Sequence, residues 1–235
     1  MNQASDSEFP TAIAPYLDLK KFMNHLAVET FLAEGDGILG PAGLANFYLY
    51  RFEKKNLFQF IVWDKDRSFS DPEQNIFRNF NDNVLARRAL AVPEARRAFL
   101  ETLQKCAVLA GQPGGWLESQ INRAVNQVRN AAVQDTNKLC PDAQGALQPC
   151  TNGQFEEGAT KLRDFAAQRS DVVRRAVSSA GFQLSPNGPR LSTGGGPLMP
   201  GSLLALYGER LAETTAQATT VPLPTNLGGI SLFIN

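Results

Sequence analysis

The sequence predicts an α+β fold in which a helix, a β-hairpin and a helical bundle precede a few short strands. Apolar residues recur at helical spacing over 19–30 and over much of 83–180, which indicates amphipathic helices. Residues 47–52 and 57–63 are aromatic and β-branched runs, as expected for paired strands. With 235 residues, the chain can bury a sizeable core in one domain, or in one domain and part of another.

The first predicted helix begins after Asp18, a suitable N-cap, and ends at Glu34-Gly35-Asp36-Gly37, where glycines break helical geometry. The loop that follows contains four glycines and a proline between Gly35 and Gly43 and runs on to Asn46. Such a composition indicates a shaped turn whose backbone can approach another group closely.

The predicted hairpin joins 47–52 to 57–63 through a short polar turn. Because side chains alternate along a strand, Asp64 and Asp66 are expected on one face at its end, with Lys65 opposite. The aromatic side chains of the hairpin are expected to pack in the core, namely Tyr48, Tyr50, Phe60 and Trp63.

The helical region is predicted to contain helices that begin at Asn83, at Pro93 and at Trp116, and a last one over about 154–180. Composition changes at Gly181, after which a Gly/Pro-rich stretch is followed by short apolar runs at 201–208 and 228–235. Too few strands fit there for a whole β-sandwich. The predicted domains are residues 10–182, a linker over 183–199, and a truncated β module over 200–235.

Composition narrows the classes of function. Lys+Arg and Asp+Glu both total 23, so the formal net charge is zero and the protein has no overall positive electrostatic field that would attract nucleic acid. No apolar run is long enough to span a bilayer. One histidine, His25, lies among helical apolar residues and is interpreted as structural or surface. Chemistry is therefore expected from carboxylates and metal. Cys140 and Cys150 form either a disulfide, in an oxidising compartment, or two thiols, and Cys106 is expected to be buried and inert.

Four side chains form the candidate site. Asp36 stands in the Gly-rich loop, Asn46 opens the first strand, and Asp64 and Asp66 follow the second. Carboxylate and amide oxygens are hard ligands of the kind that magnesium prefers. The order is that of a site holding a nucleotide through a divalent metal.

At these residues the chain resembles the spore-coat protein H (CotH) kinase family, over roughly residues 10–182. The resemblance is carried by Glu34-Gly35-Asp36-Gly37, Asn46-Phe47-Tyr48-Leu49-Tyr50-Arg51 and Trp63-Asp64-Lys65-Asp66-Arg67-Ser68-Phe69. It implies an atypical kinase-like C-terminal lobe that uses ATP and magnesium to phosphorylate serines of coat or surface proteins. By analogy, Asp36 orients the acceptor hydroxyl or acts as base, and Asn46, Asp64 and Asp66 bind magnesium and nucleotide, with either aspartate as the principal ligand.

The resemblance also sets expectations for the rest of the protein. Nothing before residue 15 can supply the N-terminal lobe that holds ATP phosphates in kinases, so a fragment cut at both ends is expected, which binds nucleotide poorly. Residues 200–211 and 222–231 resemble the start of an Ig-like module of large secreted bacterial proteins, which suggests an extracellular or surface location. The expected partners are nucleotide and a serine-containing protein; the oligomeric state cannot be read.

Several alternatives remain open. Asp36 can be a turn residue, Asn46 can hydrogen-bond the loop, and Asp64 and Asp66 can be a strand-end turn neutralised by Lys65 and Arg67. The chain can also be a non-catalytic coat or surface scaffold that keeps the fold. A metal-dependent hydrolase or nucleotidyltransferase is a third reading, because Asp-x-Asp at a strand end suits two-metal chemistry.

Overall fold

The structure is a computed structural model that describes residues 3–142, 146–182, 190–194 and 206–209. The chain forms two compact units, Met1–Phe182 and Gln183–Asn235. In the second unit, β5 (Arg190–Gly194) pairs antiparallel with β6 (Leu206–Glu209). Strand β5 falls within the range predicted as linker, and the strand predicted over 228–235 lies outside the described residues. The domain boundaries and the Ig-like module therefore stay predictions.

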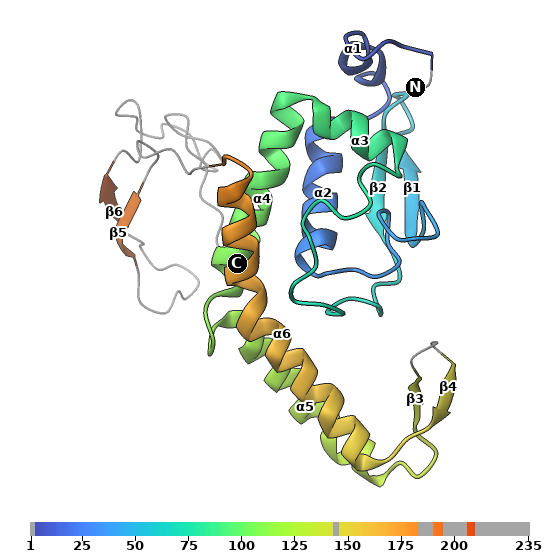
Figure 1. Cartoon of the computed structure of the whole chain (residues 1–235), viewed down its shortest axis with the longest axis vertical. Coiled ribbons are helices and arrows are strands. Elements are labelled where there is room, and N and C mark those ends of the chain that lie inside the picture. Colours follow the sequence, from blue (N-terminus) through green and yellow to red (C-terminus); the bar gives the residue numbers. More distant parts are fainter. Residues whose placement is uncertain (1–2, 143–145, 183–189, 195–205, 210–235) are drawn as a thin grey trace. The chain divides into compact units, whose positions relative to one another are not determined.

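The first unit combines helices with small antiparallel sheets, which confirms the α+β class (Figure 1). Its helices are α1 (Phe9–Ile13), α2 (Leu19–Phe31), α3 (Val84–Ala91), α4 (Pro93–Ala110), α5 (Trp116–Gln134) and α6 (Asn152–Ser179). Its strands pair as two hairpins, β1 (Phe47–Arg51) with β2 (Phe58–Val62) and β3 (Leu139–Pro141) with β4 (Leu147–Pro149). None of the helices in the described residues is long and apolar enough to cross a membrane.

The helix starts follow local capping chemistry. The Asp18 carboxylate accepts from the amides of Lys20 and Lys21 at the start of α2, as predicted. Asn83 caps α3, and Pro93 occupies the first turn of α4, where a missing amide hydrogen costs nothing. These three predictions are confirmed.

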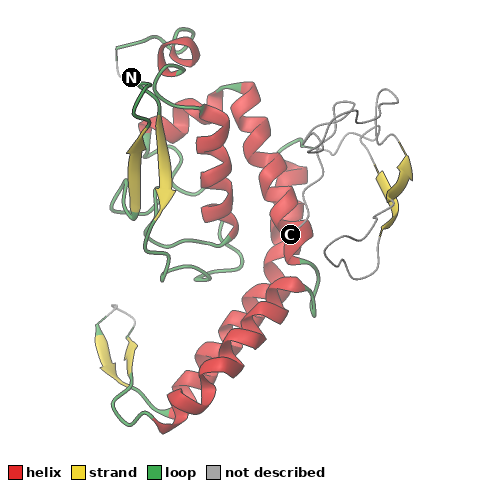
Figure 2. Ribbon diagram, turned by 180° about the vertical axis from the view of Figure 1, so that it is seen from behind, coloured by secondary structure: helices red, strands yellow, loops and turns green. Residues whose placement is uncertain are grey.

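The core of the first unit lies where α2, α4 and α6 pack together, and the views of Figures 1 and 2 show these helices side by side. Its largest fully buried apolar side chains include Phe22 and Leu26 of α2, Phe99 and Leu103 of α4, and Phe165 of α6. Helices α5 and α6 continue beyond this core as a long pair that carries β3 and β4 at its far end (Figure 2). Hairpin β1–β2 flanks α2 on the other side.

The hairpin β1–β2 buries only part of its aromatic residues. Phe60 packs on Phe22 and Phe47, with ring centroids 5.1 and 4.8 Å away. Tyr48, Tyr50 and Trp63 are 54, 50 and 53% exposed, so the prediction of a core role is wrong for these three residues. A two-stranded sheet has two faces, and only one of them meets α2.

Arg169 of α6 is the largest fully buried side chain in the described residues, and it stands on the apolar stripe of this helix, four residues from Phe165 and from Val173. Its guanidinium donates to the carbonyl oxygens of Thr30 and Phe31 at the end of α2 (2.6 and 2.9 Å) and to those of Pro72 and Gln74 (2.7 and 2.8 Å). The cation thereby pairs with carbonyls at a helix C-terminus, of which that of Thr30 also accepts from the Ala33 amide at 3.1 Å. It joins α6, α2 and the loop after β2.

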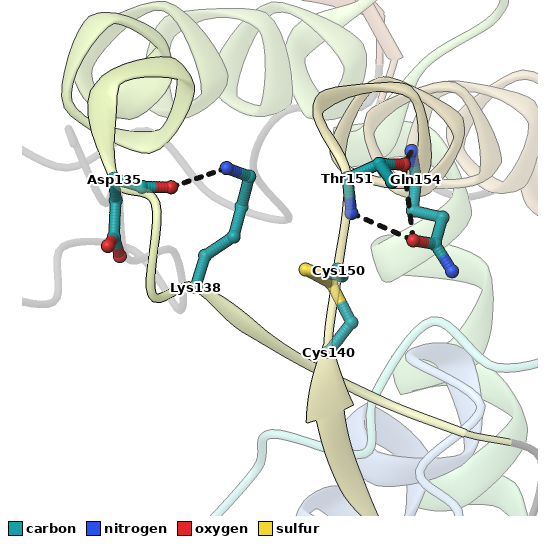
Figure 3. Close-up of a disulfide and its surroundings, with 6 residues drawn as sticks. All are labelled: Asp135, Lys138, Cys140, Cys150, Thr151 and Gln154. Carbon is teal, nitrogen blue, oxygen red and sulfur yellow. Dashed lines mark hydrogen bonds between the residues drawn. A yellow bond between two sulfur atoms is a disulfide. The ribbon is translucent and has the colours of Figure 1, made fainter.

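The cysteine alternatives are resolved in favour of a disulfide between Cys140 and Cys150 (Figure 3). The bond closes the β3–β4 hairpin, which was not predicted from the sequence, and the Cys150 amide donates to the Lys138 carbonyl at 3.1 Å. Cys106 is a free, half-buried thiol whose pKa burial raises to about 11, so it is largely protonated at neutral pH.

Candidate functional site

The loop after α2 is anchored by a buried carboxylate. Glu34 accepts a hydrogen bond from the Asp36 amide at 3.3 Å and another from the Ser68 hydroxyl at 2.7 Å. Beside it, the Gly35 amide donates to the Arg67 carbonyl at 3.0 Å. Burial raises the pKa of Glu34 and outweighs the lowering by the Ser68 hydrogen bond. The loop that carries Asp36 is therefore fixed against the segment that follows β2.

Asp36 has one carboxylate oxygen with a distant cation and one with no partner. Its Oδ2 lies 3.8 Å from Arg67 Nε, at the outer limit of an ion pair. Its Oδ1 is buried and has no hydrogen-bond partner among the described residues. A buried oxygen without a donor is costly, and such an atom is a natural place for an external donor or cation.

Asn46 is joined directly to the Asp36 segment. Its Nδ2 donates to the Asp36 carbonyl at 3.2 Å, and this orientation leaves Oδ1 as an acceptor. Asn46 also has φ +54°, in the left-handed region that few non-glycine residues adopt. The structure thus brings together two of the four predicted site residues.

Asp64 and Asp66 lie just beyond β2, and both are exposed. The strand ends at Val62 and Asp64 has φ +46°, so the strand alternation used to predict their common face does not extend to them. Lys65 between them turns inward instead. Neither Asp64 nor Asp66 has a hydrogen bond or ion pair among the described residues, so the alternative in which Lys65 and Arg67 neutralise them is wrong.

Lys65 belongs to an ionic cluster around the buried Glu29 that was not predicted from the sequence. Its Nζ lies 2.7 Å from Glu29 Oε1 and donates to the Asn46 carbonyl at 2.9 Å. The same Glu29 oxygen lies 3.1 Å from His25 Nε2. Burial raises the pKa of Glu29, but the hydrogen bonds from His25 and Lys65 and the Lys65 charge outweigh it and hold that pKa below its ordinary value.

His25 has the hydrogen-bonded, half-buried environment expected of a structural histidine. Its ring centroid lies 6.4 Å from that of Phe60. It also borders a cavity of about 470 Å³ between α2 and β2, whose other lining residues include Lys21, Asn24 and Gln59. The cavity is separate from the carboxylates of the candidate site, which do not line it.

A signal for this cluster was present in the sequence. Glu29 follows Phe22 and Leu26 on the apolar stripe of α2, and a charge on such a stripe indicates a buried partner. The partner itself could not be read, because Lys65 is 36 positions further along the chain.

The donors of the candidate site fit magnesium only in part. The described residues contain no group of three or more His, Cys, Asp or Glu side chains that could hold a metal ion. Magnesium, however, is commonly held by one or two carboxylates together with phosphate oxygens and water. The free oxygens of Asp36, Asn46, Asp64 and Asp66 suit that arrangement chemically and do not suit a cage made of protein alone.

The fold and site define an α+β domain with an acidic loop, an asparagine and an Asp-x-Asp segment gathered around one hairpin. A family model described as CotH kinase protein matches residues 1–173. The chain therefore belongs to the CotH kinase family. Comparison with curated proteins and with solved structures gives no significant match.

Proposed function

We propose that this domain transfers the γ-phosphoryl group of ATP, with magnesium, to serine side chains of a coat or surface protein. In this proposal residues 10–182 are the C-terminal part of a kinase-like domain and the chain after residue 200 begins an Ig-like module. The family supports a kinase-like domain, and the remaining details are inferred from the site. The disulfide supports export, because such bonds persist in oxidising compartments.

Each proposed residue has one task. Bound MgATP would supply the phosphoryl group, whose bond to the β-phosphate oxygen breaks as the serine oxygen attacks and ADP leaves. Asp36 would orient the serine hydroxyl and accept its proton through the carboxylate oxygen that has no partner. Asn46 and Asp64 would hold magnesium, with Asp66 as a second ligand or the principal one. Asp36 and Asn46 would act together because a hydrogen bond joins them.

The observation that carries the proposal is the buried Oδ1 of Asp36, which accepts no hydrogen bond among the described residues. The backbone carbonyl of the same residue accepts from the Asn46 side-chain amide at 3.2 Å. The carboxylate oxygens of structural aspartates in turns usually accept hydrogen bonds from nearby backbone amides. Asp36 instead has one buried oxygen that accepts from no backbone amide, and its carboxyl group lies beside that of Glu34, whose pKa it raises. This arrangement favours a functional carboxylate over the alternative of a turn residue.

The test is radiolabel transfer from γ-labelled ATP, with the full-length protein acting on itself and on casein. Asp36→Asn and the double variant Asp64→Asn/Asp66→Asn are each expected to lower the rate by about 100-fold or more. Asp164→Asn on α6 is the matched control, because Asp164 is also exposed and its loss should leave the rate unchanged. Equal transfer by wild type and the double variant would remove the metal role, and no transfer by wild type would refute the kinase proposal.

One observation favours the alternative of a non-catalytic scaffold. Tyr48, Tyr50, Ile61 and Trp63 form a largely exposed apolar face on the hairpin, with Tyr48 and Trp63 in edge contact at 4.8 Å. Exposed aromatic patches often mark protein contacts. A scaffold would keep its partner binding in the Asp64→Asn/Asp66→Asn variant and lose it when Tyr48 and Trp63 are replaced by serine.

A further inference from the structure

Lys65 occupies an unusual place, because it separates two exposed aspartates in sequence and is itself half-buried. Its side chain is only 17% exposed, whereas Asp64 and Asp66 on either side face solvent. The ammonium group has three donors and no acceptor, and two of its contacts are with Glu29 (2.7 Å) and with the Asn46 carbonyl (2.9 Å). Lys65 therefore contacts both the helix before the candidate site and the strand end within it.

Glu29 is a fixed point for this contact. Its second carboxylate oxygen accepts from the Ile38 amide at 3.1 Å, and His25 contacts its first. A methyl group added at Gly37 would lie only 2.7 Å from Glu29 Oε2, the oxygen that accepts from Ile38, so the carboxylate is packed against the loop backbone. The Glu29 side chain thus holds the Asp36 loop with one oxygen and Lys65 with the other.

We propose that Lys65 is a positioning residue, which sets the orientation of Asn46 on one side and of Asp64 and Asp66 on the other. This inference rests on the proposed function, because it assigns a task within that same site. Lys65 is drawn inward to Glu29, and its two neighbours, Asp64 and Asp66, are both exposed. The same ammonium group holds the Asn46 backbone where its side chain meets Asp36.

The backbone conformation supports this role. Asn46 and Asp64 both have φ in the left-handed region, +54° and +46°. Residues in such sparsely populated conformations persist when surrounding contacts determine them, and Lys65 is bonded to the first and adjacent to the second. Loss of the Lys65 contacts should let both residues relax and move their oxygens apart.

The test compares Lys65→Met, which keeps the length of the side chain without donors, with Lys65→Arg, which keeps charge and donors. Lys161→Met is the control, because Lys161 forms an exposed pair with Glu157 on α6, outside the site. In the full-length protein, amide exchange of peptides covering 36–47 should rise about tenfold in Lys65→Met and stay unchanged on α5. The magnesium concentration for half-maximal transfer should rise by about tenfold, as for other supporting residues of metal sites, and Lys65→Arg should recover most of it.

The outcomes separate this inference from the proposed function. Wild-type transfer together with unchanged exchange and unchanged magnesium dependence in Lys65→Met would overturn the positioning role and leave the kinase proposal standing. Absence of transfer by wild type would overturn both. If Lys65→Met does not fold, Glu29→Gln replaces it, because a neutral amide weakens the anchor of Lys65 and should raise the magnesium requirement in the same direction. An unchanged requirement in Glu29→Gln would contradict the inference.

Discussion

Arg169 offers a sharp test of how the domain holds together, because one side chain satisfies four backbone carbonyls from two segments. Replacement by Met keeps much of the apolar stem and removes every donor. Hydrogen bonds from charged groups contribute roughly 1.5–3 kcal/mol each. Against this gain stands the cost of burying the cation, which is several kcal/mol. Arg169→Met leaves no unpaired charge behind, but it leaves buried carbonyls without this donor, at about 1–3 kcal/mol each. Because the cost of burying the cation also disappears, we expect a net fall in the free energy of unfolding of about 3–5 kcal/mol.

The cation itself stays charged in the folded protein. Burial lowers the pKa of Arg169 to about 10, and the nearby charges of Asp71 and Glu73 oppose that shift, so at pH 7 the guanidinium remains protonated. For a domain of this size, a loss of 3–5 kcal/mol corresponds to a fall in melting temperature of roughly 6–20 °C. The same loss is about a fifth or more of the total stability of a typical small domain, which is roughly 5–15 kcal/mol.

The assay for Arg169→Met is urea unfolding followed by far-ultraviolet circular dichroism. Arg175→Met is the matched control on α6, because Arg175 is exposed and its one hydrogen bond, to the Asp171 carbonyl, is within the same helix. The control should change the free energy of unfolding by less than about 0.5 kcal/mol. A loss below about 1 kcal/mol in Arg169→Met, or one equal to the control, would refute the account of α6 as joined to α2 through this cation.

Three further predictions concern the loop and the hairpins. In Glu34→Gln the free energy of unfolding should exceed that of wild type at pH 7, because the raised pKa of Glu34 makes its ionised form costly in the folded protein. The difference should shrink as the pH falls towards 4.5. Urea titrations at several pH values measure it, and a difference that grows on acidification would contradict the prediction. Cys140→Ser/Cys150→Ser should lower the free energy of unfolding by about 2–3 kcal/mol, with no difference from wild type in reductant. Asn83→Ala should cost about 1 kcal/mol in thermal unfolding, since Asn83 caps α3, and an unchanged melting temperature would contradict this.

Features that depend on neighbours in sequence could be predicted well. Asp18, Asn83 and Pro93 mark helix starts because capping and a fixed proline φ act within one turn. The hairpin β1–β2 could be predicted for the same reason, since strand propensity and turn composition are local. The three-residue strands β3 and β4 are too short to carry an alternation, so the sequence revealed their turn and cysteines only.

Features that depend on contacts between residues far apart in the sequence could not be predicted. Arg169 lies 138 positions from the Phe31 carbonyl that it binds. Its place on the apolar stripe of α6, four residues from Phe165 and from Val173, indicates a buried partner but does not identify that partner. Trp63 illustrates the converse, because its aromatic character suggested burial while the second face of a two-stranded sheet has no layer over it in the described part of the first unit. For the candidate site, the carboxylate and amide residues could be chosen from the sequence, but the contacts between them could not be predicted from it.

The two buried glutamates beside the Asp36 loop respond to pH in opposite directions, and the reason is the charge of their donors. Burial raises the pKa of Glu34, and the neighbouring Asp36 carboxyl adds to this rise against the lowering by the Ser68 hydroxyl. Glu29 faces Lys65 and His25 instead and has a lowered pKa. Because the pKa of Glu34 is raised in the folded protein, its ionised form lowers the free energy of unfolding. This loss of stability disappears as the pH falls towards 4.5, the ordinary pKa of the group. A lowered carboxyl pKa stabilises the fold above 4.5 and loses that contribution only as the pH falls through its lower value. Mild acidification therefore neutralises Glu34 first and leaves the Glu29–Lys65 pair intact, so the loop keeps its ionic anchor until the pH is below that of ordinary carboxyl titration.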